Sequence, residues 1–152
     1  MDFDFTDEQV MFRDMARSFA EREILPVTAE DERNEYYRPE TIKKLAALGL
    51  LAAPIPQEYG GLGVDSICYA LICEQIAYAS AGIFTTALTV HTSLFQQALL
   101  QAMNEEQKQK YFPKTTKGEL LGCYALTEPN AGSDAASLET SAVQKGDKWI
   151  LN

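Results

Sequence analysis

The sequence predicts a mainly α-helical protein, in which a bundle of about five helices is followed by the first strands of a β domain. Apolar residues recur at helical spacing, between helix-capping residues, over most of the first 118 positions. From Glu119 onward the pattern changes to short apolar runs that end in Gly- and Pro-containing breaks, as strands do. We therefore expect an N-terminal α-helical domain over 1–118 and the beginning of a second, incomplete β domain over 119–152.

The first helix is expected to begin after Thr6, because a threonine N-cap with Gln9 three residues later forms a capping box. It is expected to end near Pro26, since proline disfavours helical backbone at the residue before it. The acidic stretch 30–35 is then either a solvated connection or a continuation of this helix.

Four more helices are expected, over 39–49, 66–78, 83–103 and 105–116, with a Pro- and Gly-rich loop over 53–63. The helix over 83–103 is expected to be largely buried, because it is apolar and too long for a strand. The residues expected to face inward from the second helix are Ile42, Leu45, Ala46 and Leu48, and those at helical spacing in the third are Ile67, Leu71, Ile72 and Ile76. The residues expected to cap or end these helices are Gly49, Asp65, Asn104 with Gln107, and Gly118.

A strand is expected over 122–127, and a hairpin over 140–145 and 148–151 with its turn at Gly146-Asp147. Two or three strands do not form an independently stable β domain. We therefore expect a chain that is truncated or that is completed by a second polypeptide.

Composition excludes several classes of function. The net charge of −9 argues against a nucleic-acid-binding protein, which would present a basic face. No run of 18 apolar residues could span a membrane, and the acidic start, residues 1–5, is unlike a targeting peptide. Three cysteines, an odd number, fit reduced thiols in a cytoplasmic protein, and the spacing of Cys68 and Cys73 suits no common metal site.

The most informative segment is Tyr124–Asp134, which contains Thr-Glu-Pro-x-x-Gly-Ser-Asp. It offers a hydroxyl at a strand end, backbone N–H groups, and a turn of small residues that a ligand can approach closely. Its six fixed positions would recur by chance with a probability of only ~10⁻⁶.

This segment resembles the first signature segment of the FAD-dependent acyl-CoA dehydrogenases. The resemblance covers the whole chain, in the order and spacing of that family's N-terminal helical domain and the start of its central β-barrel domain. The other segments that carry it are Phe5–Gln9, Leu48–Leu51, Pro56–Gly63, Glu74–Ala77, Gln107–Pro113 and Lys145–Asn152.

The resemblance implies α,β-dehydrogenation of an acyl-CoA thioester to trans-2-enoyl-CoA, as in fatty acid β-oxidation, with FAD as cofactor and an electron-transferring flavoprotein as electron acceptor. It also implies a homotetramer. The family's catalytic carboxylate belongs to a C-terminal domain outside these residues, so no catalytic residue is expected here and the 152 residues alone are expected to be inactive.

The same resemblance places the flavin along the signature segment. It implies that backbone groups of Leu126 and Thr127, with the Thr127 hydroxyl, bond the flavin ring, and that Ser133 contacts both FAD and the CoA part of the substrate. The residues so implied in cofactor binding are Tyr124, Ala125, Leu126, Thr127, Gly132 and Ser133.

Several residues that could be assigned a catalytic or binding role also have a structural interpretation. Glu128, before a proline, is expected to be a structural break rather than the base. His91 is expected to be a buried, hydrogen-bonded histidine, and Trp149 a packed strand residue. Gly132 and Asp134 are expected to form a turn, glycine through positive φ and aspartate through capping.

Two other functions stay open. An acyl-CoA oxidase or a related flavin monooxygenase shares parts of these motifs, and a non-enzymatic helical interaction module could retain the sequence. Residues 83–93 resemble the family's acyl-pocket region, where glutaryl-CoA-specific relatives place an arginine. Thr85 or its neighbours stand there, so we expect neutral acyl-CoA substrates.

Overall fold

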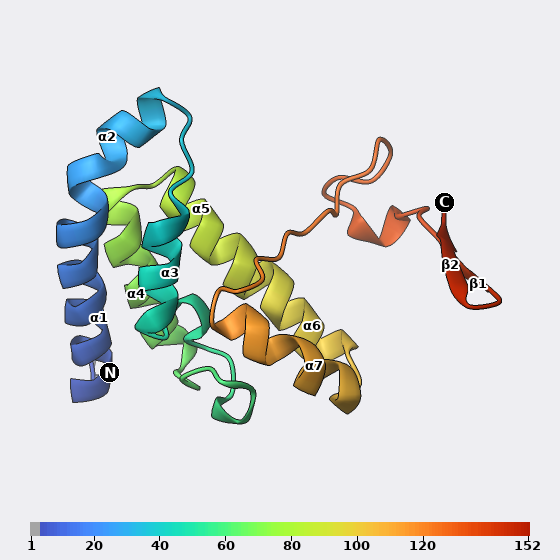
Figure 1. Ribbon diagram of the computed structural model, residues 1–152, viewed down its shortest axis with the longest axis horizontal. Coiled ribbons are helices and arrows are strands. Elements are labelled where there is room, and N and C mark those ends of the chain that lie inside the picture. Colours follow the sequence, from blue (N-terminus) through green and yellow to red (C-terminus); the bar gives the residue numbers. More distant parts are fainter. Residues whose placement is uncertain (1–3) are drawn as a thin grey trace.

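The computed structural model describes residues 4–152 and is mainly α-helical, as predicted. Besides two 3-10 helices, η2 Leu50–Ala52 and η3 Gln57–Tyr59, five continuous helical stretches lie within residues 7–116 (Figure 1). Three of them are single helices: α3 Pro39–Ala47, α4 Ser66–Ala79 and α7 Glu105–Thr116. The first consists of α1 Asp7–Phe19, a π-helical segment η1 Ala20–Ile24, and α2 Leu25–Arg33. The fourth consists of α5 Ile83–Thr89, a π-helical segment η4 Val90–Gln96, and α6 Gln97–Ala102.

The first helix begins as predicted, because Thr6 Oγ1 accepts the Gln9 N–H at 3.2 Å and Gln9 Oε1 accepts the Thr6 N–H at 3.1 Å. The predicted end near Pro26 is wrong, and the helix continues to Arg33. In η1 the Leu25 N–H donates to the Ala20 C=O, five residues back. This shift places Pro26 in the first turn of α2, where a missing N–H costs little. The acidic stretch is therefore a helix continuation up to Arg33.

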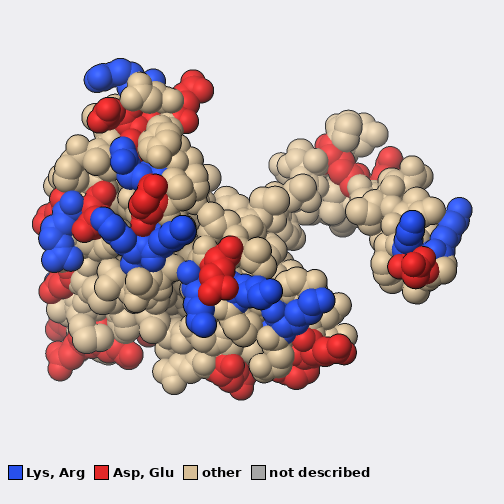
Figure 2. All heavy atoms as spheres, viewed as in Figure 1, with Lys and Arg blue, Asp and Glu red and all other residues tan. Residues whose placement is uncertain are grey.

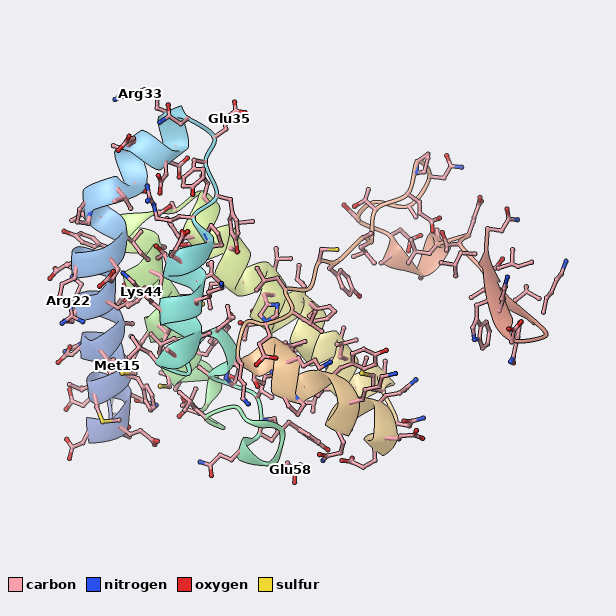
Figure 3. All side chains as sticks on the ribbon, viewed as in Figure 1. Met15, Arg22, Arg33, Glu35, Lys44 and Glu58 are labelled. Carbon is pink, nitrogen blue, oxygen red and sulfur yellow. The ribbon has the colours of Figure 1, made fainter. Side chains whose placement is uncertain are left out.

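The second helix ends as predicted at Gly49, which has a left-handed φ of 75°. Ile42 and Leu45 are buried, but the prediction for Leu48 is wrong, since 38% of it is exposed. Leu48 is the C-cap residue of α3, one position beyond the helical face that covers the core. Lys44, on the same side of α3 as Leu48, points toward the first helix and pairs with the Glu23 carboxylate (Figure 3).

The main core lies between α1, η1, α3, α4 and α5, and its largest contact is that of α1 along α4. The face of α4 that it uses runs through Cys68, Ile72 and Ile76, each four residues after the last. Ile67 lies one position off this face and is 54% exposed, although it shares helical spacing with the other apolar residues. The fourth helix is buried on one face only, and α6 has no buried residue, so the expectation of a largely buried helix is wrong.

A smaller apolar cluster joins the loop before α4 to α7. The Tyr59 ring stacks on Phe112 at 5.2 Å, and its hydroxyl donates to the Glu105 carboxylate at 2.9 Å. This bond is the main reason that the pKa of Tyr59 is raised to about 12. Both ends of α7 match their predicted capping residues: Asn104 forms a capping box with Gln107, and Gly118 takes a left-handed φ of 68°.

The turn between α2 and α3 is held by one ion pair with a buried member. Arg38 donates to both carboxylate oxygens of Asp31, whose side chain is 2% exposed. The hydrogen bonds from Arg38 lower the pKa of Asp31 and outweigh its burial, which acts in the opposite direction. The turn beyond Arg33 includes Glu35, the one non-glycine residue with positive φ (51°) in the described part of the chain (Figure 3).

Residues 119–152, called the arm below, extend away from the helical body formed by residues 4–118 (Figure 1). The predicted hairpin is confirmed: β1 Ala142–Lys145 pairs antiparallel with β2 Lys148–Leu151 around a turn at Gly146, whose φ is 64°. Trp149 is 63% exposed, so the prediction of a packed residue is wrong, because no further strand or helix among the described residues covers the hairpin.

Charges of both signs intersperse over the visible face of the helical body, while the arm carries no lysine or arginine between Lys117 and Lys145 (Figure 2). None of the helices over residues 4–152 is long and apolar enough to cross a bilayer. The expectation for the acidic start of the chain concerns mainly residues 1–3, which lie outside the described residues.

Candidate functional site

Residues 121–127, which follow α7 and lead into the signature segment, have no regular secondary structure. The strand predicted over 122–127 does not form, because no neighbouring strand lies beside it in the described structure. The next backbone pairing along the chain joins Glu128 to Ala131, through two hydrogen bonds of 3.0 and 3.2 Å. Within residues 4–152, the backbone N–H and C=O groups of Tyr124 to Thr127 form no hydrogen bond. This stretch therefore offers unpaired donors and acceptors to a ligand.

A hollow of about 530 Å³ lies against this stretch. It brings together four of the residues implied in cofactor binding, Tyr124 to Thr127, with two that sequence reasoning missed, Leu138 and Thr140. Glu128 also lines it, so the hollow combines a stretch of unpaired backbone with polar residues and the apolar Leu126 and Leu138. Apolar residues with a few hydrogen-bonding groups are typical of small-molecule binding sites. Only the return of the chain after Asp134 brings Leu138 and Thr140 here, and no local sequence pattern marks them.

Gly132 and Ser133 lie outside this hollow and are exposed. The expectation of a positive φ at Gly132 is wrong, and a Cβ at that position would meet no atom within 4 Å. Asp134 does cap a turn, as predicted, since its carboxylate accepts the Ala136 N–H at 3.2 Å and the Ser137 hydroxyl. The geometry thus groups Tyr124 to Thr127 but keeps Gly132 and Ser133 apart from them.

Glu128 holds the loop of the signature segment closed. Its two carboxylate oxygens accept the backbone N–H groups of Glu139 and Thr140, at 2.8 and 3.0 Å. The hydrogen bonds from Thr140 and Glu139 lower the pKa of Glu128, so the carboxylate is ionised at neutral pH. A carboxylate engaged by two amides and stabilised in its charged form is a weak proton acceptor, so this geometry favours the structural role.

His91 is buried, 1% exposed, and hydrogen-bonded on both ring nitrogens, as predicted. Nδ1 accepts the Gly122 N–H at 3.0 Å, and Nε2 lies 3.0 Å from the Thr115 C=O. Burial lowers its pKa, against the smaller opposite effect of the Thr115 carbonyl, and so favours the neutral ring. The ring joins the helical body to the residue two positions before Tyr124.

A second, mostly apolar cavity of about 530 Å³ lies beside His91, between α3, α5, η4 and the start of the arm. Glu32 is the one charged residue that lines it among those described, and its carboxylate accepts the Ser80 hydroxyl at 3.3 Å and the Ile83 N–H at 3.4 Å. From α5, Ile83, Thr86 and Ala87 line it. Thr85 does not, and its hydroxyl donates to the Ser80 C=O at 2.6 Å. The cavity therefore suits an uncharged apolar group.

The three cysteines lie in different environments: Cys68 is buried, Cys73 half-buried and Cys123 exposed. Burial raises the pKa of the Cys68 and Cys73 thiols, which keeps both protonated at neutral pH. Among residues 4–152, no three His, Cys, Asp or Glu side chains gather as a metal site would require.

Comparison with known proteins adds independent information. A family model described as "Acyl-CoA dehydrogenase, N-terminal domain" matches residues 6–119. An acyl-CoA dehydrogenase of Bacillus subtilis (strain 168) is 44% identical over 147 residues, which are 97% of this chain and 38% of that protein. The chain thus spans about two fifths of the length of this curated relative.

Solved structures agree over both the helices and the arm. The butyryl-CoA dehydrogenase of Megasphaera elsdenii is 35% identical with a TM-score of 0.88, over 100% of this chain and 40% of that one. An acyl-CoA dehydrogenase of Bacillus anthracis complexed with FAD is 37% identical with a TM-score of 0.87, over 98% of this chain and 26% of that one.

Proposed function

Since this chain belongs to the acyl-CoA dehydrogenase family, we propose that it forms the N-terminal part of an FAD-dependent enzyme. That enzyme would convert an acyl-CoA thioester to its trans-2-enoyl-CoA. Residues 1–118 would be the helical domain and 119–152 the start of the middle β domain. The observation that carries the proposal is the hollow against Tyr124–Thr127, where unpaired backbone groups meet apolar side chains.

FAD fits these residues, because its ring needs hydrogen-bonding partners along one edge and apolar contact on its face. Backbone groups of Leu126 and Thr127, with the Thr127 hydroxyl, would bond the ring edge, and Tyr124 and Ala125 would extend that wall. Gly132 and Ser133 would contact the cofactor further along, with Ser133 also reaching the CoA part of the substrate. Bound FAD would accept the hydride that leaves the β-carbon.

The chain's own contribution is to position the cofactor. The unpaired amides would stabilise charge that develops on the ring, since fixed donors need no reorganisation as that charge forms. Glu128 would keep the loop in place through the Glu139 and Thr140 amides. The carboxylate that removes the α-proton would come from a part of the protein outside these residues.

The apolar cavity beside His91 supports a neutral acyl group as substrate. Its described lining contains no lysine or arginine that could pair with a distal carboxylate, and Glu32 would repel one. Burying an unpaired carboxylate costs several kcal/mol. A dicarboxylic acyl-CoA such as glutaryl-CoA would therefore be a poor substrate.

The family relationship supports three further proposals about the whole protein: a homotetramer, a cytoplasmic location, and an electron-transferring flavoprotein as the electron acceptor. Together with the substrate they place the enzyme in the β-oxidation of fatty acids.

The test uses the whole flavoprotein that carries this chain. Thr127→Val keeps the shape of the side chain and removes its hydroxyl, so FAD binding or flavin reduction should weaken by about 1–3 kcal/mol. Glu128→Gln is the control, and it should change the rate of flavin reduction far less than loss of a base would. Stopped-flow bleaching of the flavin by saturating acyl-CoA measures both. A wild-type protein without bound FAD, or a nearly inactive Glu128→Gln enzyme, would contradict the proposal.

A further inference from the structure

One buried side chain connects the helical body to the start of the signature segment. The Gly122 N–H can only donate, so the Nδ1 atom of His91, 3.0 Å away, must accept. The neutral ring then carries its proton on Nε2 and donates it to the Thr115 C=O at 3.0 Å. His91 therefore fixes the end of α7 and the beginning of the arm through one ring, in a single tautomer.

A second contact holds the same point of the arm. The Phe95 ring stacks on His91, with centroids 5.7 Å apart, and a Cβ built on Gly122 would lie 2.0 Å from a Phe95 ring carbon. Only glycine can therefore lie against this ring without displacing it. The two contacts fix the backbone two residues before Tyr124, where the hollow begins.

The helix that presents these rings is π-helical from Val90 to Gln96. The next residue after His91 faces a different neighbour, since the Thr92 hydroxyl donates to the Leu51 C=O at 2.7 Å inside the helical body. Adjacent residues of η4 thus hold different parts of the molecule: Thr92 holds the body together, and His91 holds the arm to the body. Single π-helical turns occur frequently at functional sites.

We propose that His91 is a positioning residue for the flavin site, which sets the direction in which Tyr124–Thr127 leaves the helices. The proposal rests on the flavin-binding function argued above and assigns a remote determinant to it. His91 lines the apolar cavity but not the hollow, so its effect on the flavin would pass through Gly122 and the residues that follow.

The experiment compares three variants of the whole flavoprotein. His91→Phe keeps an aromatic ring against Phe95 and removes both hydrogen bonds. Thr92→Val is the matched control, because it deletes a buried hydrogen bond of the same helix without touching the arm. His91→Asn can still accept the Gly122 N–H through Oδ1, although it loses the bond to Thr115. Each protein is measured for FAD dissociation constant, thermal midpoint, and deuterium exchange over residues 120–128.

We expect His91→Phe to weaken FAD binding at least tenfold and to speed exchange over residues 120–128. Thr92→Val should lower the thermal midpoint but leave FAD affinity within twofold, and His91→Asn should recover part of the lost affinity. If His91→Phe does not fold, the FAD affinities of His91→Asn and Thr92→Val are compared instead, and His91→Asn should bind FAD more weakly than Thr92→Val does.

The role of His91 would be overturned if the His91 and Thr92 variants bound FAD equally well. It would also be overturned if the loss of FAD affinity in every variant simply paralleled its drop in thermal midpoint. A wild-type protein that binds no FAD would instead overturn the proposed function, and this inference with it.

Discussion

The helical body and the arm differ in how they are stabilised. The body encloses a core of apolar side chains that are almost fully buried, whereas Ala131 is the one buried residue from 119 to 152. Yet the arm carries the signature segment, and the body carries none of the residues implied in flavin binding. The body thus has a core of its own, while the arm has almost none and depends on what binds or packs against it. Stability and ligand binding should therefore respond to different substitutions.

The largest expected effect compares two aromatic residues. Phe84 is 2% exposed in the main core, so Phe84→Ala should destabilise the chain by about 3–5 kcal/mol. Trp149→Ala, in the exposed hairpin, should cost less than about 0.5 kcal/mol. Urea unfolding followed by far-ultraviolet circular dichroism measures both. Comparable losses would show that the arm shares the core of the body.

An intermediate effect is expected at the ion pair of the α2–α3 turn. Arg38→Ala leaves the Asp31 carboxylate buried without its partner, which should lower the free energy of unfolding by about 2–3 kcal/mol. This loss is smaller than that for a fully buried ion pair, because Arg38 is partly exposed. Arg13→Ala, in the exposed pair with Asp14, is the control and should change stability by less than about 0.5 kcal/mol.

The same pair predicts a dependence on pH. The folded-state pKa of Asp31 is lowered from its ordinary value of 3.8, so the stabilisation is complete above pH 3.8 and is lost as the pH falls through the folded-state pKa. The stability difference between the wild type and Arg38→Ala should therefore shrink in acid. Urea unfolding at several pH values tests this, and a difference that grows in acid would refute the assignment.

The smallest expected effect concerns a helix cap. Asn104→Ala removes the acceptor of the Gln107 N–H at 2.9 Å and should cost about 1 kcal/mol. Gln101→Ala, at an exposed position of α6, should leave stability unchanged within about 0.5 kcal/mol. A neutral Asn104→Ala would mean that packing on Phe112, rather than the cap, holds α7 in place.

Features set by neighbouring residues could be predicted from the sequence. Both capping boxes formed as expected, because the Thr6–Gln9 and Asn104–Gln107 partners lie three residues apart. The left-handed glycines at positions 49 and 118 ended their helices for the same local reason. The hairpin turn also needed only adjacent residues.

Features that depend on distant residues could not. The end of the first helix was predicted wrongly although its cause is local: the π-helical segment before Pro26 places the proline in the first turn of α2, where its missing N–H costs little. The strand predicted over 122–127 does not form, because a strand requires a partner. At the candidate site, the sequence indicated Tyr124–Thr127 but neither Leu138 nor Thr140. It likewise predicted that His91 is buried but not its partners, which lie 24 and 31 residues away.

Deuterium exchange along the chain, with and without FAD, tests the central claim most directly: the arm, not the helical body, supplies the flavin-binding surface. In the whole flavoprotein we predict that FAD slows exchange over residues 123–128 at least tenfold, while the core helix α4 stays protected to the same extent in both states. Unchanged exchange over residues 123–128, with protection appearing only in the helices, would contradict the account.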